Sequence, residues 1–319
     1  MKVLRFLCLF IIFTMRNISA DDFNEAAFLV PSNGNEWQEQ KLFFQKNGYL
    51  WIKDFFSEEQ VALIQSWAHD INQSAQSLLK LTQNNGPSLK YLQQTIPGSL
   101  IVVPESNDPS QVCRAEDLLS CYPDLYDFTL SSVTVFIVRL LEEPYVLFKD
   151  KLNFKWPGGG AFLPHQDFPA YEPFAPREHV TVMISVDPAT LENGCLHVAK
   201  NWQKTFLGDP VIDPEHLEMG RAVLPYNEGG KGHGSIQAQY AEKMTWHPLE
   251  TSPRDLVLIN SFVPHYSEPN KSQNSRRAMF FTHNRLEEGE FRSTYYRTKR
   301  QDPDNPVFHF ATPTKARTK

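Results

Sequence analysis

The sequence predicts an α+β fold in which amino-terminal helices buttress an antiparallel β-barrel or sandwich. Two observations lead to this prediction. The first half of the chain contains stretches with apolar residues at helical spacing, and the second half contains short β-branched and aromatic runs separated by Pro, Gly and Asn. Helices followed by many short strands are typical of α+β domains, because the strands pair with one another and the helices cover the sheet.

The strongest helical pattern begins at Ser57. Ser57 is a good helix cap, acidic residues follow it, and apolar residues then recur every three or four positions as far as Leu81. This pattern predicts a long amphipathic helix over residues 57–81. A second helical stretch covers residues 124–141.

After residue 141 the pattern changes to that of strands. Clusters of turn-forming residues bound each apolar run, so each run is short enough to be one strand. The predicted strands are 145–156, 180–186, 196–199, 256–259 and 278–282.

The composition is that of a globular protein. The chain has 319 residues, of which 41% are hydrophobic and 21% charged, and no repeat or obvious linker divides it. We therefore expect residues 21–319 to form a single domain. The full chain has 31 basic and 37 acidic residues, and its formal charge of -6 argues against nucleic acid as a partner.

Residues 1–20 resemble a secretory signal peptide. They contain Lys2, Arg5 and Arg16 but no acidic residue, and an apolar run of about ten residues ends before Ser19-Ala20. This run is too short to span a bilayer, so we expect no stable membrane anchor. The segment predicts secretion or delivery to the endoplasmic reticulum lumen. The alternative is a mitochondrial presequence, which the three bases and the position of Arg16 would also fit.

Removal of this segment would leave a charge of (31 - 3) - 37 = -9. It would also leave three cysteines. Cys113 and Cys121 lie close enough in sequence to form a disulfide in an oxidising compartment, which would leave Cys195 unpaired.

The most informative local motif is His165-Gln166-Asp167, which follows a glycine-rich loop. On an extended backbone residues two apart point the same way, so His165 and Asp167 can converge on one metal ion. His216-Leu217-Glu218 has the same residue types, but Asp213-Pro214 before it resembles a helix start, where positions two apart diverge. We rank it below His165 and Asp167, and assign no role to four further histidines, His179, His197, His247 and His283.

A third ligand is predicted at His265. The strand LVLIN runs toward it, so its imidazole is expected near a strand end. Two histidines and one carboxylate form the facial triad of non-haem Fe(II) oxygenases, which leaves coordination positions open. Arg276 and Arg277 follow a polar loop. If the strands on either side form a hairpin, one of these guanidinium groups lies beside the imidazole and can hold a co-substrate carboxylate.

These motifs together resemble the phytanoyl-CoA dioxygenase family of Fe(II)/2-oxoglutarate oxygenases. The resemblance covers most of the chain after residue 20. It includes the triad and an arginine eleven residues beyond His265. Phe43 to Phe56 resembles the family's opening strand, and Glu192-Asn193-Gly194 its turn before a strand. Two loops depart from the family pattern, at Lys200-Asn201-Trp202 and Pro253-Arg254-Asp255, and neither contains a predicted ligand.

The resemblance implies a double-stranded β-helix, which is a jelly-roll or cupin-like barrel, with iron on His165, Asp167 and His265. It also implies that Arg276 rather than Arg277 binds 2-oxoglutarate, and that Gln166 contacts this co-substrate. The enzyme would use Fe(II), 2-oxoglutarate and O2 to hydroxylate a small organic substrate, releasing succinate and CO2. The alternative is a non-catalytic metal-binding barrel, or a Zn hydrolase that retains the triad.

The substrate is less well specified, and the sequence does not determine the oligomeric state. The residues around the His165 motif resemble the branch that contains aminoethylphosphonate-type hydroxylases, which implies a phosphonate-like zwitterion. A fatty acyl compound is the alternative. Lys151, Asn153 and Lys155 alternate on one predicted strand, where they form either a solvated edge or an anion contact. Tyr171 and Phe174, like Trp156, are either packing residues or walls of the substrate pocket.

Overall fold

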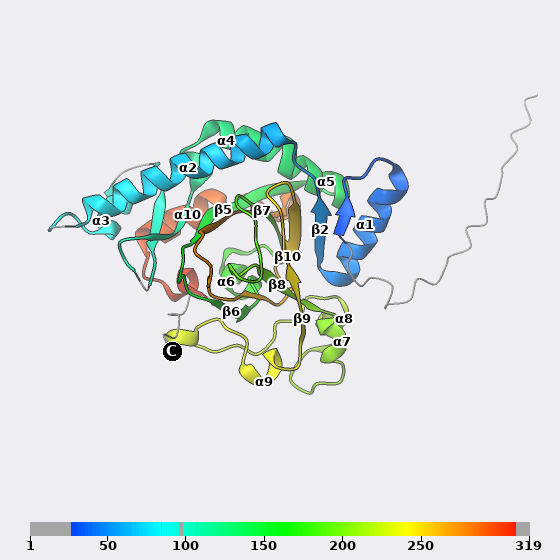
Figure 1. Cartoon of the computed structure of the whole chain (residues 1–319). Coiled ribbons are helices and arrows are strands. Elements are labelled where there is room, and N and C mark those ends of the chain that lie inside the picture. The colour runs from blue at the N-terminus through cyan, green and yellow to red at the C-terminus, as the bar shows by residue number, and fades with distance from the viewer. Residues whose placement is uncertain (1–26, 84, 96–97, 107, 311–319) are drawn as a thin grey trace, which may run out of the picture.

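Two β-sheets surround a common interior in the computed structural model of the chain (Figure 1). The structure describes residues 27–83, 85–95, 98–106 and 108–310, so the predicted leader over residues 1–20 lies outside the described residues. The described strands are β1 (Ala27–Leu29), β2 (Tyr49–Lys53), β3 (Ile101–Pro104), β4 (Val112–Glu116), β5 (Tyr145–Lys155), β6 (Phe162–His165), β7 (His179–Ser185), β8 (Leu196–Lys200), β9 (Thr245–Leu249), β10 (Leu256–Asn260), β11 (His265–Ser267) and β12 (Arg276–Arg285).

The larger sheet has the strand order β1-β2-β10-β7-β12-β5-β4-β3, and the smaller has β6-β11-β8-β9. Strands β1 and β2 are parallel, and the other paired strands of the two sheets are antiparallel. This is the α+β jelly-roll fold. The five strands predicted from the sequence correspond to β5, β7, β8, β10 and β12.

The helices lie mainly outside the barrel (Figure 1). They are α1 (Gly34–Asn47), α2 (Glu58–Leu81), α3 (Leu89–Thr95), α4 (Pro123–Phe128), α5 (Val135–Leu141), α6 (Phe168–Tyr171), α7 (Trp202–Thr205), α8 (Pro214–Glu218), α9 (Ala238–Ala241) and α10 (Arg292–Gln301). Short 3-10 turns cover Leu118–Ser120, Glu172–Phe174, Gly230–Gly232, Leu286–Glu288 and Pro306–His309. Within the described residues, no helix is both long and apolar enough to cross a membrane.

Helix α2 confirms the prediction over residues 57–81. Ser57 and Gln60 form a reciprocal capping box at its start, and each satisfies a backbone N–H that the helix leaves without a partner. Its buried residues are spaced three or four apart, so they lie on one face, and the helix packs against β3 and β4. They are Ile64, Ala68, Ile71, Ala75 and Leu79.

The predicted helix over residues 124–141 is present but is not uniform. A π-helical turn, Thr129–Thr134, separates α4 from α5. The hydroxyls of Thr129 and Ser131 donate to the carbonyls of Leu125 and Asp127, at 2.7 and 2.8 Å, and such side-chain bonds compete with regular helical bonding.

The expected opening strand over Phe43 to Phe56 is wrong in its first part. Helix α1 continues to Asn47, and the strand β2 begins only at Tyr49. Gly48 between them has φ 73°, and a Cβ there would lie 2.4 Å from Val263 Cγ2. A glycine is required because both the left-handed backbone and the close contact exclude a side chain.

The expected hairpin between the strands on either side of His265 is also wrong. Strands β10 and β12 belong to the larger sheet, but β7 lies between them. After β10 the chain crosses to the smaller sheet, where His265 begins β11, and then returns to form β12. Alternation between the two sheets, and not a local hairpin, brings His265 and Arg276 to the same interior.

Candidate metal and co-substrate site

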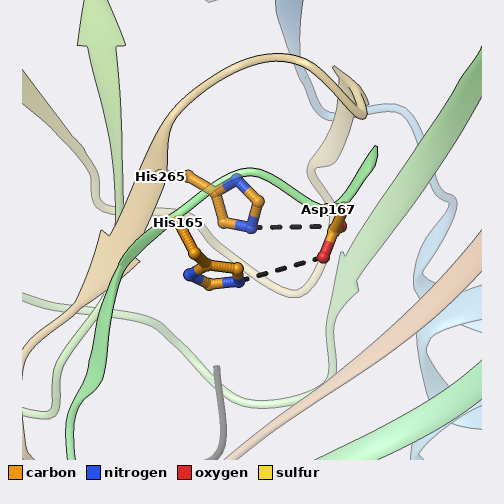
Figure 2. Close-up of side chains that lie close together, drawn as sticks. All are labelled: His165, Asp167 and His265. Atoms are coloured by element: carbon orange, nitrogen blue, oxygen red, sulfur yellow. Dashed lines mark ion pairs between the residues drawn. The ribbon is translucent and has the colours of Figure 1, made fainter. Parts of the chain in front are cut away.

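Three predicted ligands meet inside the barrel (Figure 2). His165 ends β6, Asp167 lies two residues later at the start of α6, and His265 begins β11. The Nε2 atoms of His165 and His265 lie 3.8 and 3.9 Å from the two carboxylate oxygens of Asp167. One ligand atom from each residue lies within 4.8 Å of the other two, so the three can surround a single ion.

A backbone carbonyl orients each imidazole through the ring nitrogen that faces away from Asp167. His165 Nδ1 lies 2.7 Å from the carbonyl of Leu163, and His265 Nδ1 lies 2.9 Å from the carbonyl of Val263. A carbonyl only accepts hydrogen bonds, so each Nδ1 is the protonated nitrogen and each Nε2 has its lone pair free toward Asp167.

The pKa shifts at this site favour metal binding. Burial lowers the pKa of His165 to about 3, and His265 acts in the same direction. Burial opposes ionisation of Asp167, but His265, Lys151 and His165 outweigh it, and the pKa of Asp167 falls to about 2. At neutral pH His165 is therefore neutral and Asp167 is charged, which are the forms that bind a cation.

The alternative ligand pair is not part of this site. His216 and Glu218 lie on α8, and His216 forms an ion pair with Asp213 at 3.2 Å where both side chains are more than half exposed. Two imidazoles and one carboxylate that leave one side open fit a ferrous ion better than a closed zinc site.

A cavity adjoins the triad and is lined by both sheets and by the end of the described chain. From the larger sheet it receives cationic side chains of β4, β5 and β12, and from the smaller sheet His265, Tyr266 and Ser267. Val307, Phe308 and Phe310 lie outside both sheets and form another part of the wall.

Arg276 lies in this cavity. It is buried at the start of β12, and its guanidinium donates to the carbonyl of Gly194, while its Nε has no hydrogen-bond partner among the described residues. A buried N–H without a partner is unfavourable, which indicates that a ligand completes it. Burial lowers the pKa of Arg276 to about 10, so the group remains charged at neutral pH.

Gly194 and Lys155 complete the surroundings of Arg276. Gly194 has φ 76°, and a Cβ there would lie 2.2 Å from the carbonyl oxygen of Glu268. Lys155 pairs with Arg276 in the backbone register of β5 and β12, and its ammonium donates to Ser267 Oγ at 2.7 Å and to the carbonyl of Glu268. Two buried basic side chains therefore face the same end of the cavity, and burial, together with Arg276, holds the pKa of Lys155 well below its usual value.

Arg277 has a different role. Its guanidinium forms a two-pronged ion pair with Asp187, at 2.8 and 2.7 Å, and it does not line the cavity. Adjacent residues on a strand point to opposite faces, so only one of the two arginines can reach the interior. The structure places Arg276 there.

The expectation for Gln166 is not met. Its side-chain amide donates to the carbonyls of Ala222 and Phe262, and its oxygen accepts from the N–H of Leu224. It is absent from the cavity wall. Because His165 and Asp167 point inward, the residue between them points away, and Gln166 instead ties the metal-binding segment to the 222–224 segment.

Much of the cationic wall was not predicted from the sequence. Lys149, Lys151, Asn153 and Lys155 all line the cavity from β5, so the alternating residues 151, 153 and 155 are not a solvated edge. The alternation begins two residues earlier than expected, at Lys149. Arg114 joins them from β4, and nothing in its local sequence distinguishes it from a surface arginine.

The aromatic residues near the triad divide between the two roles considered. Tyr171 lines the cavity, whereas Phe174 packs in the adjoining core and Trp156 donates to the carbonyl of Val112. The ring of Tyr171 already has the Lys149 ammonium at 5.5 Å from its centroid.

The two cysteines considered for a disulfide are free thiols. Cys113 is buried and Cys121 is half-buried, and Cys121 Sγ lies 2.7 Å from the carbonyl oxygen of Gly98.

This fold and this site define a class, the iron- and 2-oxoglutarate-dependent oxygenases. The model of the family "Phytanoyl-CoA dioxygenase (PhyH)" matches residues 44–278, and the chain belongs to that family. It is 37% identical over 269 residues to the 2-aminoethylphosphonate dioxygenase of Uncultured bacterium HF130_AEPn_1, covering 83% of this chain and 87% of that protein. It is 30% identical over 259 residues to the methylphosphonate hydroxylase of Gimesia maris, covering 81% and 84% respectively.

Solved structures share the fold. EctD from S. alaskensis, with 2-oxoglutarate and 5-hydroxyectoine, matches with a TM-score of 0.58 at 16% identity, covering 78% of this chain and 76% of that one. The epimerase SnoN, with Fe3+ and alpha ketoglutarate, matches with a TM-score of 0.55 at 12% identity, covering 80% and 85%.

The protein is therefore a 2-oxoglutarate-dependent dioxygenase that uses Fe(II), 2-oxoglutarate and O2. This is the first of the two classes considered from the sequence, and not a non-catalytic metal-binding module or a Zn hydrolase. The residues present fit these groups, since three ligand atoms converge with their lone pairs free and the buried Arg276 Nε lacks a partner.

Proposed function

We propose that the enzyme hydroxylates a small organic phosphonate. The observation that carries this proposal is the cavity wall, where Arg114, Lys149 and Lys151 face the interior in addition to Arg276 and Lys155. The relatives named above support it, because one acts on 2-aminoethylphosphonate and another on methylphosphonate.

In this proposal His165, Asp167 and His265 hold the ferrous ion. When bound together with 2-oxoglutarate and O2, the iron supplies the oxidation of a C–H bond, with succinate and CO2 as the other products. Arg276 binds the far carboxylate of 2-oxoglutarate through its planar guanidinium. Lys155 lies beside it, and the bound carboxylate would favour the charged form of this lysine, whose pKa burial lowers.

The remaining cations would bind the phosphonate head. Lys149 and Lys151 alternate on β5, so their side chains reach the same face, and Arg114 comes from the neighbouring strand β4. Burial lowers the pKa of both lysines, and a bound anion would favour their charged forms.

The test is a substrate panel. The purified chain, loaded with Fe(II) and supplied with 2-oxoglutarate and O2, is incubated with 2-aminoethylphosphonate, methylphosphonate or a fatty acyl-CoA, and succinate is measured. We expect a phosphonate to accelerate succinate formation and to gain one oxygen atom in mass. Acceleration by fatty acyl-CoA alone would contradict the proposal.

We also propose that residues 1–20 direct the chain to the secretory route. Their charge and apolar pattern support this proposal. Expression of the full chain in eukaryotic cells tests it, with the amino terminus of the product determined by mass spectrometry. A terminus near Asp21 in material from the secretory route is expected, whereas mitochondrial accumulation would favour the alternative.

A further inference from the structure

Glu116, at the end of β4, lies behind the cationic part of the cavity wall, in contact with Arg114 and Lys149, which line it. Its carboxylate is completely buried, with Lys299 Nζ 2.8 Å from both oxygens, Arg114 Nε at 2.6 Å and Lys149 Nζ at 3.9 Å. Lys299 belongs to α10, so this contact connects the carboxy-terminal helix to the sheet.

The charges in this cluster do not balance. With all three basic side chains protonated, three cations surround one carboxylate, which gives this buried cluster a formal surplus of two positive charges. Burial lowers the pKa of Lys149 and of Lys299, so a bound anion favours this fully charged form. Lys151 lies nearby, but the charge with which it interacts most strongly is Asp167 of the metal triad. Among the described residues that line the cavity, Asp167 is the only acidic one.

Such a surplus is unfavourable until an anion neutralises it, because buried charges need partners. A monoanion would neutralise half of it and a dianion all of it. Glu116 and Lys299 do not line the cavity, so they act by setting the number and position of the charges that do.

We propose that Glu116 and Lys299 are positioning residues of a dianion site, formed with Arg114 and Lys149, through which the enzyme selects substrates by the charge of the head group. This inference rests on the proposed function. It adds that a phosphonate is preferred over a sulfonate of the same shape, since a sulfonate carries one negative charge and a phosphonate close to two at about pH 8.

The direct test compares 2-aminoethylphosphonate with 2-aminoethanesulfonate in the unaltered, iron-loaded enzyme. The two compounds share the carbon chain, the ammonium group and a tetrahedral head, and differ in head-group charge. We expect kcat/KM from succinate formation to be at least about five-fold lower with the sulfonate.

Three variants distinguish the effect of the cluster's charge on substrate preference from a structural effect of the substitutions. Lys299→Met reduces the surplus from two to one, so the preference for the phosphonate should fall at least three-fold, mainly through a higher KM for the phosphonate. Lys299→Arg retains the charge and should retain the preference. The double variant Glu116→Gln/Lys299→Met removes one charge of each sign and keeps the surplus at two, so it should recover part of the preference that Lys299→Met loses.

The outcomes are distinguishable. Sulfonate turnover within a factor of five of phosphonate turnover overturns the dianion site but not the proposed function. A preference in Lys299→Met equal to that of the unaltered enzyme also overturns it. If thermal melting shows that Lys299→Met is unfolded, the unaltered enzyme and the double variant decide. If neither compound nor methylphosphonate accelerates succinate formation, the proposed function fails, and this inference with it.

Discussion

His165 and His265 lie directly opposite each other in the antiparallel pair of β6 and β11, with ring centroids 4.2 Å apart. Exact register between two strands that are far apart in sequence thus defines two corners of the metal site. If the register between β6 and β11 shifted by one residue, one of the two imidazoles would point out of the barrel, because side chains alternate between the two faces of a strand.

Removal of one imidazole should therefore abolish activity. We expect His265→Ala to lose bound iron and succinate formation, because two ligands alone hold the ion weakly. Iron content measured by atomic absorption, together with a succinate assay, checks this. His216→Ala is the matched control, since His216 is exposed on α8, and it should behave as the unaltered protein. Full iron content in His265→Ala would contradict the site.

The two adjacent arginines should differ in effect. Arg276→Ala removes a buried guanidinium from the cavity and should raise the KM for 2-oxoglutarate about 10- to 100-fold, as expected for loss of hydrogen bonds between charged groups. Arg277→Ala breaks the ion pair with Asp187 instead. It should lower the free energy of unfolding by about 1 kcal/mol or less and leave this KM within about two-fold. Equal KM values in both variants would refute the distinction.

Gln166→Leu should affect stability more than co-substrate binding. The substitution leaves two buried carbonyls and one N–H without the partners that Gln166 provides, and the free energy of unfolding should fall by about 2–3 kcal/mol. Urea denaturation measures this loss. If Gln166 instead contacted 2-oxoglutarate, the KM for that compound would rise while the denaturation midpoint stayed unchanged.

His283 should make folding sensitive to mild acid. Burial lowers its pKa from 6.5 to about 4, so between these values the unfolded chain binds more protons than the folded one. The stability it contributes is complete above pH 6.5 and is lost as the pH falls toward 4. When the pH falls from 7.5 to 5, the free energy of unfolding should decrease by about 2 kcal/mol through this group.

His283→Gln tests the assignment, because glutamine retains a polar group near Thr134 Oγ1, which lies 2.9 Å from His283 Nε2, and does not titrate. The pH dependence of its unfolding free energy should be flatter than that of the unaltered protein. The same pH dependence in both proteins would show that other groups account for it.

Local sequence patterns were sufficient for some features and not for others. The spacing of His165 and Asp167 specifies their shared direction, and the apolar periodicity after Ser57 specifies α2, since both depend on residues close in sequence. The position of β7 between β10 and β12 depends on pairing between distant strands, and for that reason the hairpin prediction failed. Arg114 could not be identified because β4 was not predicted and its partner Glu116 is buried only in the folded barrel.

Val307 and Phe308 lie beside the active-site cavity although they belong to neither sheet. The chamber is thus completed by a segment that follows the last strand. Exchange of this segment offers a route to altered substrate range that leaves the barrel strands unchanged.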